Sequence, residues 1–245
     1  NDLNPIIHAV DPGAVSPELR AKFEQTALGL VKQGVRAFGE MAAMHLSMQE
    51  AHVAEMAPPD HPLMLALADI AAKHDMAIDL HTEAVAEDMP RPGNLPQKNP
   101  ATLKANIPGL EKLLSHNPKA RIVWQHLGWD NTGHRTVELS RRVLKAHPNL
   151  FLAIRVEKRP MQIGGKAPMP NRIVDRDGKI SPEWMELFKE FPNRFVIGTD
   201  EFFNPSGGSP APIESFRTTW TILDQLPEEL KDKFGRDNAL AIYRF

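Results

Sequence analysis

The sequence predicts an α/β fold with a mostly parallel sheet, and two observations carry that prediction. Short apolar runs alternate along the chain with segments that have helix start and stop signals. The runs are continuously apolar, which is typical of parallel strands buried on both faces. Six runs are expected to be strands: PIIHAV (5–10), VRAFG (35–39), AIDL (77–80), RIVWQ (121–125), LFLAI (150–154) and FVIG (195–198).

The helical segments between these runs have recognisable ends. Ser16 is expected to cap the first helix, because a proline follows it. Asp60 is expected to start the next helix, and residues 99–100 (Asn-Pro) to open a further helical region. Ser181 has the same place before another helix. Residues 214–245 are expected to form a helix, a turn, a short helix and a final helix.

Composition is that of a soluble globular protein, and we expect a single domain over residues 1–245. Hydrophobic residues make up 42% and charged residues 24% of the chain. The net charge of −2 argues against nucleic acid as a partner, and no run approaches the roughly 18 apolar residues of a membrane span. The absence of cysteine excludes thiolate ligands and nucleophiles. A small-molecule substrate is expected; a homo-oligomer, and a cytoplasmic or periplasmic location, remain open.

Polar residues end the apolar runs, and this favours a (β/α)₈ barrel over a doubly wound sheet. The carboxyl ends of barrel strands converge on one face, whereas a doubly wound sheet would spread them along an edge. Six strands are two fewer than a barrel needs, so the first strands are expected to precede Asn1. The residues at or just beyond the ends of the runs are His8, Glu40, His81, His126, Arg155 and Asp200.

Three of these residues suggest a metal site. His81, His126 and Asp200 offer the nitrogen and oxygen donors that suit zinc or a similar divalent ion. Asp200 could be a ligand or the base that takes a proton from water. Taken singly, each histidine could be a structural residue, and Asp200 a helix cap or ion-pair partner. Their shared position at strand ends favours a common site.

Other residues carry two readings each. Glu40 is either a ligand or nearby carboxylate of the metal site, or a partner of Arg36 or of a lysine. Arg155 could hold a substrate carboxylate through its planar fork, as could Lys158, or form a surface ion pair.

The loop after His126 also has two readings. Trp129 and His134 could line the pocket or belong to a helix-capping loop. His8 is expected to pack near the site, and His45 is given no role, since it is expected in a loop or helix. The Gly- and Pro-rich loop at 161–178 could fold over the site.

Several motifs together resemble the amidohydrolase superfamily, and most closely its amidohydrolase-related (amidohydrolase 2) branch. They are AIDLHTE (77–83), RIVWQHLGW (121–129), FVIGTDEFF (195–203) and the tail LPEELKDKFGRDNALAIYRF (226–245). The resemblance covers the chain from about Ile6 onward. It implies a (β/α)₈ barrel, in many members with one metal ion.

The resemblance also implies residue roles. His81 matches the metal-ligand histidine of the fifth strand, and His126 matches the sixth-strand histidine, a ligand or a catalytic acid/base. Asp200 matches the eighth-strand aspartate that orients or deprotonates water. Arg155 ends the seventh strand, where family members often contact substrate.

One family feature is missing: the first-strand His-x-His pair occurs nowhere in this sequence. Metal binding without it is expected to be weak, and some members of this branch work without metal. The expected function is metal-dependent hydrolysis of a small, carboxylated lactone or amide. Zinc is the first choice of cofactor, with manganese or no metal as alternatives. A non-oxidative decarboxylase on the same scaffold and a non-catalytic ligand-binding barrel are the competing hypotheses.

Overall fold

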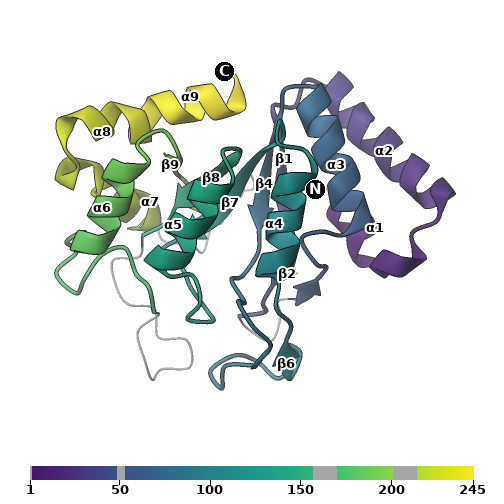
Figure 1. Cartoon of the computed structure of the whole chain (residues 1–245), viewed down its shortest axis with the longest axis horizontal. Coiled ribbons are helices and arrows are strands. Elements are labelled where there is room, and N and C mark those ends of the chain that lie inside the picture. The colour runs from purple at the N-terminus through teal and green to yellow at the C-terminus, as the bar shows by residue number, and fades with distance from the viewer. Residues whose placement is uncertain (1, 49–52, 157–169, 201–213) are drawn as a thin grey trace.

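A five-stranded parallel sheet forms the centre of the protein (Figure 1). The computed structural model describes residues 2–48, 53–156, 170–200 and 214–245. The α/β class and the parallel sheet predicted from the sequence are therefore confirmed. The strands are β1 (Ala37–Ala42), β4 (Ala77–His81), β7 (Arg121–Leu127), β8 (Leu150–Ile154) and β9 (Phe195–Ile197).

The order of these strands is that of a barrel. They lie side by side in chain order, β1-β4-β7-β8-β9, with no reversal of direction across the sheet. A doubly wound sheet has a point at which the strand order reverses. The described strands thus form an arc in barrel order, in which β1 and β9 each pair on one side only.

The expectation of a strand at PIIHAV is wrong, because this segment contains helix α1 (Asn4–His8). Pro5 has no N–H to give to a sheet, but its fixed φ suits the first turn of a helix. The helix covers the outer edge of β1 through Asn4. The Asn4 side-chain amide donates to the Glu40 carbonyl at 2.9 Å and accepts from the Ala42 N–H at 3.0 Å, as a neighbouring strand would.

The helices follow the expected rhythm, with two corrected starts. The Ser16 hydroxyl accepts a hydrogen bond from the Leu19 N–H at 3.2 Å, as predicted for a cap. The third helix is capped by His61 rather than Asp60, and the fourth begins at Ile107 rather than at 99–100. The main helices are α2 (Pro17–Lys32), α3 (Pro62–Lys73), α4 (Ile107–His116), α5 (Val137–Ala146) and α6 (Pro182–Glu190).

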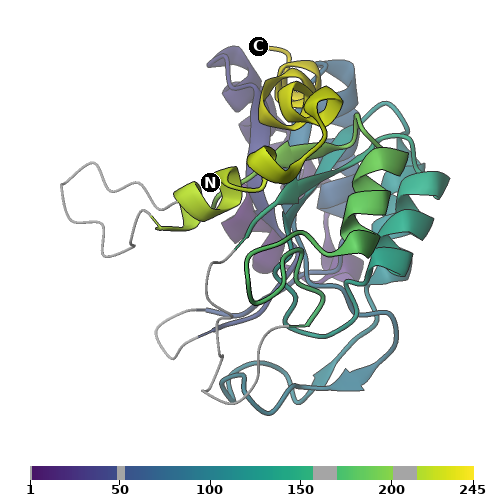
Figure 2. The ribbon, with the colours of Figure 1, turned by 90° about the vertical axis from the view of Figure 1, so that its left-hand side faces the viewer.

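The C-terminal region has the predicted succession of short helices. Its last helix, α9, lies across the amino ends of the strands, at the top of Figure 1 and of Figure 2. The Arg121 Nε–H donates to the Ile242 carbonyl at 2.7 Å and ties this helix to β7. The elements are α7 (Glu214–Trp220), a 3₁₀ turn (Leu223–Gln225), α8 (Glu228–Asp232), a π-helical turn (Lys233–Asp237) and α9 (Asn238–Tyr243).

The two faces of the sheet are packed differently. The face toward the helices carries large side chains such as Trp124 and Phe195, which belong to the main hydrophobic core. The inner face carries smaller ones, which pack with Ile242 of α9 in a separate cluster. Alternation along each strand separates the two sets. The small inner residues are Ala77, Val123, Ala153 and Val196.

Two short hairpins extend the core at the carboxyl ends of the strands. They are β2 (Met44–His45) with β3 (Glu55–Met56), and β5 (Met89–Pro90) with β6 (Thr102–Leu103), both antiparallel. Within the described ranges, none of the helices has the length and apolar character needed to cross a bilayer.

Candidate metal centre

Glu40, His81 and His126 converge at the carboxyl ends of three neighbouring strands. One donor atom from each lies within 4.8 Å of the other two. The Glu40 Oε1 accepts a short hydrogen bond from the His81 Nδ1 and lies 3.2 Å from the His126 Nε2. The two imidazole rings are 4.8 Å apart. Glu40 is more exposed to solvent than His126: 39% of the Glu40 side chain is exposed, against 8% of the His126 side chain.

All three side chains point toward the inner face, His81 through regular alternation and the other two beside irregularities in strand pairing. His81 reaches that face by simple alternation from Ala77. The pairing of β1 with β4 shifts register between Phe38 and Met41, which brackets Glu40. The pairing of β7 with β8 shifts in the same way around His126. Such irregularities commonly redirect a side chain next to an active site.

Two residues near the cluster have a left-handed backbone. His126 has a φ of 61° and Asp200 a φ of 54°. This conformation costs a residue with a side chain about 1 kcal/mol or more, and such strain is concentrated at functional sites. Both residues lie at or just beyond the carboxyl end of a strand.

The three residues of the cluster differ in protonation state, because their surroundings shift their pKa values in different directions. Partial burial would raise the pKa of Glu40, but hydrogen bonds from His126 and His81 outweigh it and hold that pKa well below its usual range. Burial would lower the pKa of His81, yet hydrogen bonds to Glu40 and Glu83 raise it to about 9. Burial lowers the pKa of His126. Near neutral pH the cluster therefore holds an anionic Glu40, a protonated His81 and a neutral His126.

These donors fit a divalent cation. Two imidazoles and a carboxylate are the ligand types that zinc prefers when no thiolate is present. The His126 Nδ1 is buried and has no hydrogen-bond partner among the residues that the structure describes. A buried polar atom of this kind can receive a ligand or an ion. It faces Asp200, because the other nitrogen of the ring, Nε2, faces Glu40. A bound cation would also replace the charge that the His81 proton supplies beside Glu40.

Asp200 lies beside this cluster and faces a cation of the protein. Its Oδ2 is 4.0 Å from the His126 Nδ1, and it forms an ion pair with the Arg155 guanidinium. The Arg155 Cζ lies 4.0 Å from the centroid of the Trp129 ring. Arg155 is thus held from two directions, by a carboxylate and by an aromatic face. Trp129, Arg155, Asp200 and His126 thus lie next to one another in this order.

The amidohydrolase sequence model matches residues 29–245. The chain belongs to the amidohydrolase family. No curated protein matches the sequence. The family match includes all three residues of the cluster and the Arg155–Asp200 pair.

Several solved structures are similar to this amidohydrolase at low identity. A 2,6-dihydroxybenzoate decarboxylase from Rhizobium is 13% identical, with a TM-score of 0.47 over 96% of this chain and 68% of that chain. A uronate isomerase from Bacillus halodurans is 14% identical, with a TM-score of 0.47 over 99% and 53%. An amidohydrolase from Mycobacterium avium subsp. paratuberculosis is 10% identical, with a TM-score of 0.45 over 91% and 55%. The chain spans little more than half the length of the last two.

The loop after β7 is fixed by its own hydrogen bonds. The buried Asp130 carboxylate accepts from the backbone N–H groups of Thr132, Gly133 and Arg135, each at 3.0 Å. His134 is part of this construction, since its Nδ1 accepts from the Ala86 N–H at 3.0 Å. In this loop Trp129 faces Arg155, whereas His134 faces the segment that follows β4.

Some expected participants fall outside the described residues. They are Lys158 and the first nine residues of the 161–178 loop.

The structure also adds residues that the sequence analysis left without a role. The His45 ring is 4.0 Å from the His81 ring, and its Nδ1 is 3.4 Å from the Glu55 Oε2. His45 lies on strand β2, so its expected placement in a loop or helix is wrong. The Glu83 Oε1 lies 4.0 Å from the His81 Nε2. Strand alternation in AIDLHTE, continued past His81, would have identified Glu83. The two-residue strand of His45 offers no such pattern.

Proposed function

We propose that this amidohydrolase is a metal-dependent hydrolase that opens a small, carboxylated lactone or amide with an activated water. The observation that carries the proposal is the meeting of two features at the carboxyl ends of the strands. One is the donor cluster of Glu40, His81 and His126; the other is the Arg155–Asp200 pair beside it. Active sites of barrel enzymes are built at this end.

His81, His126 and Glu40 would hold the metal. Zinc suits two imidazoles and one carboxylate, and manganese is the alternative that accepts the same donors. When bound, such an ion supplies Lewis-acid polarisation of the scissile carbonyl and lowers the pKa of water toward neutrality.

Asp200 is the residue that we propose accepts a proton. Its Oδ2 lies 4.0 Å from the His126 Nδ1, so it borders the cluster without belonging to its close core. The ion pair with Arg155 fixes one of its oxygens. The second oxygen can accept the proton of the attacking water. The proton can then pass to the leaving oxygen or nitrogen as the ring opens.

Arg155 is the residue that we propose binds the substrate carboxylate. A guanidinium presents its N–H donors in a planar fork that matches the two oxygens of a carboxylate. The Trp129 ring packs against the Arg155 guanidinium and limits the orientation of its plane. A substrate carboxylate held there would place the neighbouring carbonyl close to Asp200, which is what proximity catalysis requires.

Metal content tests the proposal most directly. About one zinc or manganese per chain is expected by elemental analysis, and it should be lost in His81→Ala. The matched control is His116→Ala, because His116 is paired with Asp69 on the surface and lies outside the cluster. Equal metal content in the two variants would remove the proposed site.

Activity assays then separate the roles of the two remaining residues. Asp200→Ala is expected to retain metal and lose turnover by roughly a hundredfold or more. Arg155→Ala should raise KM for carboxylated substrates at least about tenfold and change kcat less. Full turnover by Asp200→Ala would exclude it as the base. Release of CO₂ instead of a new carboxylate would replace hydrolysis by decarboxylation.

A further inference from the structure

His81 has two ring nitrogens, and the structure gives them different neighbours. Its Nδ1 hydrogen-bonds the Glu40 carboxylate, which belongs to the donor cluster. Its Nε2 lies 4.0 Å from the Glu83 Oε1. A histidine that binds a metal through one nitrogen commonly turns the N–H of the other toward a carboxylate, which fixes the ring. Glu83 occupies the position of such a carboxylate.

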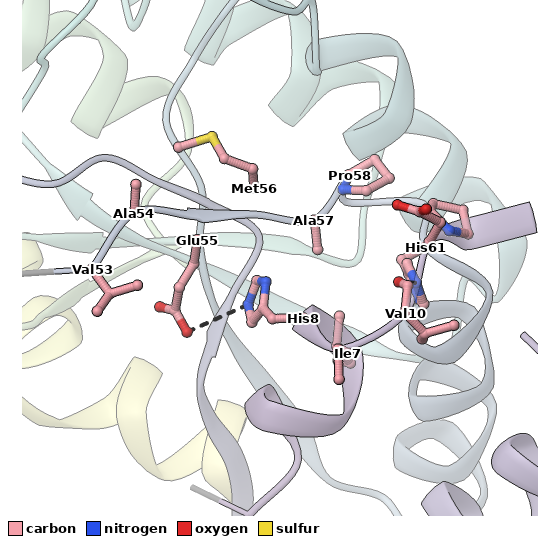
Figure 3. Close-up of a pocket in the computed structure, with 13 residues that line it drawn as sticks. Ile7, His8, Val10, Val53, Ala54, Glu55, Met56, Ala57, Pro58 and His61 are labelled. Atoms are coloured by element: carbon pink, nitrogen blue, oxygen red, sulfur yellow. Dashed lines mark hydrogen bonds and ion pairs between the residues drawn. The ribbon is translucent and has the colours of Figure 1, made fainter. Parts of the chain in front are cut away.

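A second glutamate near His81, Glu55, does not occupy this position. It lines a cavity of about 540 Å³ between α1 and β3 (Figure 3). Figure 3 shows its carboxylate directed at His8, with the Oε1 at 3.5 Å from the His8 Nε2. The His45 ring contacts the His81 ring, and its Nδ1 lies 3.4 Å from the Glu55 Oε2. His45 thus separates Glu55 from the cluster, whereas Glu83 faces His81 directly.

The backbone at Glu83 is fixed on both sides. Its N–H donates to the Met44 carbonyl at 2.9 Å, and its carbonyl accepts from the Asn106 Nδ2 at 2.6 Å. Only 6% of the Glu83 side chain is exposed. Among the residues that the structure describes, its ion-pair partner is His81. Burial of a carboxylate is costly unless the group is paired, so this arrangement favours a hydrogen on the His81 Nε2.

The loop after β7 fixes how Glu83 interacts. The Asn131 Nδ2 donates to the Glu83 Oε1 at 2.6 Å, and the Asn131 Oδ1 accepts from the Trp129 Nε1–H at 3.2 Å. An indole nitrogen can only donate, so Asn131 must turn its oxygen toward Trp129 and its N–H groups toward Glu83. The Glu83 Oε1 is therefore an acceptor. Because the same oxygen faces the His81 Nε2, that nitrogen must present an N–H to it.

We infer that Glu83 is a positioning residue of the metal centre, which keeps a hydrogen on the His81 Nε2 and leaves the Nδ1 lone pair for a metal ion. A neutral imidazole has a hydrogen on one nitrogen and a lone pair on the other, so fixing one nitrogen fixes both. The lone pair then points to the side on which Glu40 offers its Oε1. This inference rests on the proposed function, because it explains how His81 is prepared for the metal proposed there.

The ring nitrogen that binds zinc is the first test. Long-range proton–nitrogen correlation NMR of the zinc-loaded protein distinguishes a protonated ring nitrogen from a metal-bound one. The resonances of His81 are identified by their absence from His81→Ala. A protonated Nε2 and a zinc-bound Nδ1 are expected. Zinc bound through Nε2 would overturn the inference, because Glu83 would then face the metal instead of an N–H.

The zinc affinity is the second test. Glu83→Gln removes the charge and keeps the size of the side chain, and it should raise the Kd for zinc by about ten- to a hundredfold in competition with a chelator. Glu87→Gln is the matched control, since Glu87 is exposed on the segment that follows β4 and loses the same charge. The control should bind zinc as the wild type does. A merely structural role of Glu83 would lower the free energy of unfolding of the metal-free protein and leave the Kd unchanged.

The inference and the proposed function fail in different ways. Zinc bound equally well by Glu83→Gln and Glu87→Gln overturns the role of Glu83 and leaves the metal site in place. If Glu83→Gln does not fold, the NMR experiment on the wild-type protein still decides. Absence of zinc binding by the wild-type protein overturns the proposed metal site and this inference with it.

Discussion

The two faces of the central sheet carry different kinds of side chain, and only the inner face carries the metal centre. The outer face carries large apolar side chains, among them Trp124 and Phe195, and packs them against α2 to α6. The inner face carries small apolar residues at the amino ends, then Asp79, then His81 with Glu40 and His126. The outer face stabilises the fold by burying apolar area. The inner face gives up much of that stabilisation to hold charged groups.

Asp79 shows what the inner face costs. It lies two residues before His81 on β4, and its Oδ1 accepts a hydrogen bond from the Tyr243 hydroxyl at 2.7 Å. Burial raises the pKa of Asp79 to about 6, in spite of hydrogen bonds from Tyr243 and Gln125. A carboxylate that is harder to ionise when folded reduces stability at neutral pH. Its presence is typical of a site selected for something other than stability.

The largest difference between the faces is expected on β9, where neighbouring residues point in opposite directions. Phe195 is fully buried against the helices, and Val196 is 2% exposed on the inner face. Phe195→Ala should lower the free energy of unfolding by about 3–5 kcal/mol, because it leaves a large cavity. Val196→Ala removes two carbons and should cost about 1–2 kcal/mol. Urea denaturation of both variants would measure the difference; equal losses would refute the contrast.

Gly39 tests how tightly the inner face is packed below the metal centre. An added Cβ there would lie 2.7 Å from the Asp79 Cβ and 2.9 Å from its Oδ2. Gly39→Ala is therefore expected to cost about 1–3 kcal/mol. It should also weaken metal binding through its neighbour Glu40.

The control for this substitution is Gly29→Ala. Gly29 lies in α2 with no atom within 4 Å of the added Cβ. Helix propensity alone should stabilise that variant by about 0.5–1 kcal/mol. Thermal unfolding of the pair, with and without zinc, gives opposite signs if the packing argument holds. A neutral Gly39→Ala would show that the inner face has room to spare.

Asp79→Asn is expected to have the next smaller effect, and it should stabilise the protein rather than destabilise it. Removing the charge should raise the free energy of unfolding at pH 7 by on the order of 1 kcal/mol. The gain should shrink as pH falls from 6 toward 4, because Asp79 then takes up a proton in the folded protein. Denaturation of Asp79→Asn and wild type at pH 7 and pH 4.5 would show this. A gain that is independent of pH would assign it to packing instead.

The sequence predicted the outer features of this site better than its contacts. The apolar runs predicted that His81 and His126 lie at the ends of strands, and they begin at the first residue of four of the five strands. The run PIIHAV misled, because a short apolar segment fits a buried helix as well as a strand. His45 and Glu55 came together through a hairpin of two-residue strands, which leaves no periodic signal. The pairing of Asp200 with Arg155 joins two loops and depends on tertiary packing.

The smallest expected effect is a pH dependence confined to the metal-free protein. The pKa of His81 is raised to about 9, well above the ordinary histidine value, so its proton stabilises the folded state. This contribution is complete below about pH 6.5 and is lost as pH rises through 9. Taken alone, the pKa shift corresponds to roughly 3 kcal/mol. The loss should be smaller, on the order of 1 kcal/mol, because His81 and His126 share Glu40 and Glu40 keeps its hydrogen bond to His126. Urea denaturation between pH 6 and pH 9.5 would detect the decline.

Two controls assign this decline to the His81 proton. The decline should vanish in His81→Ala, and bound zinc should abolish it by displacing the proton. A decline that persists in His81→Ala would place the responsible group elsewhere, and would remove the electrostatic reason for treating Glu40 and His81 as a site prepared for a cation.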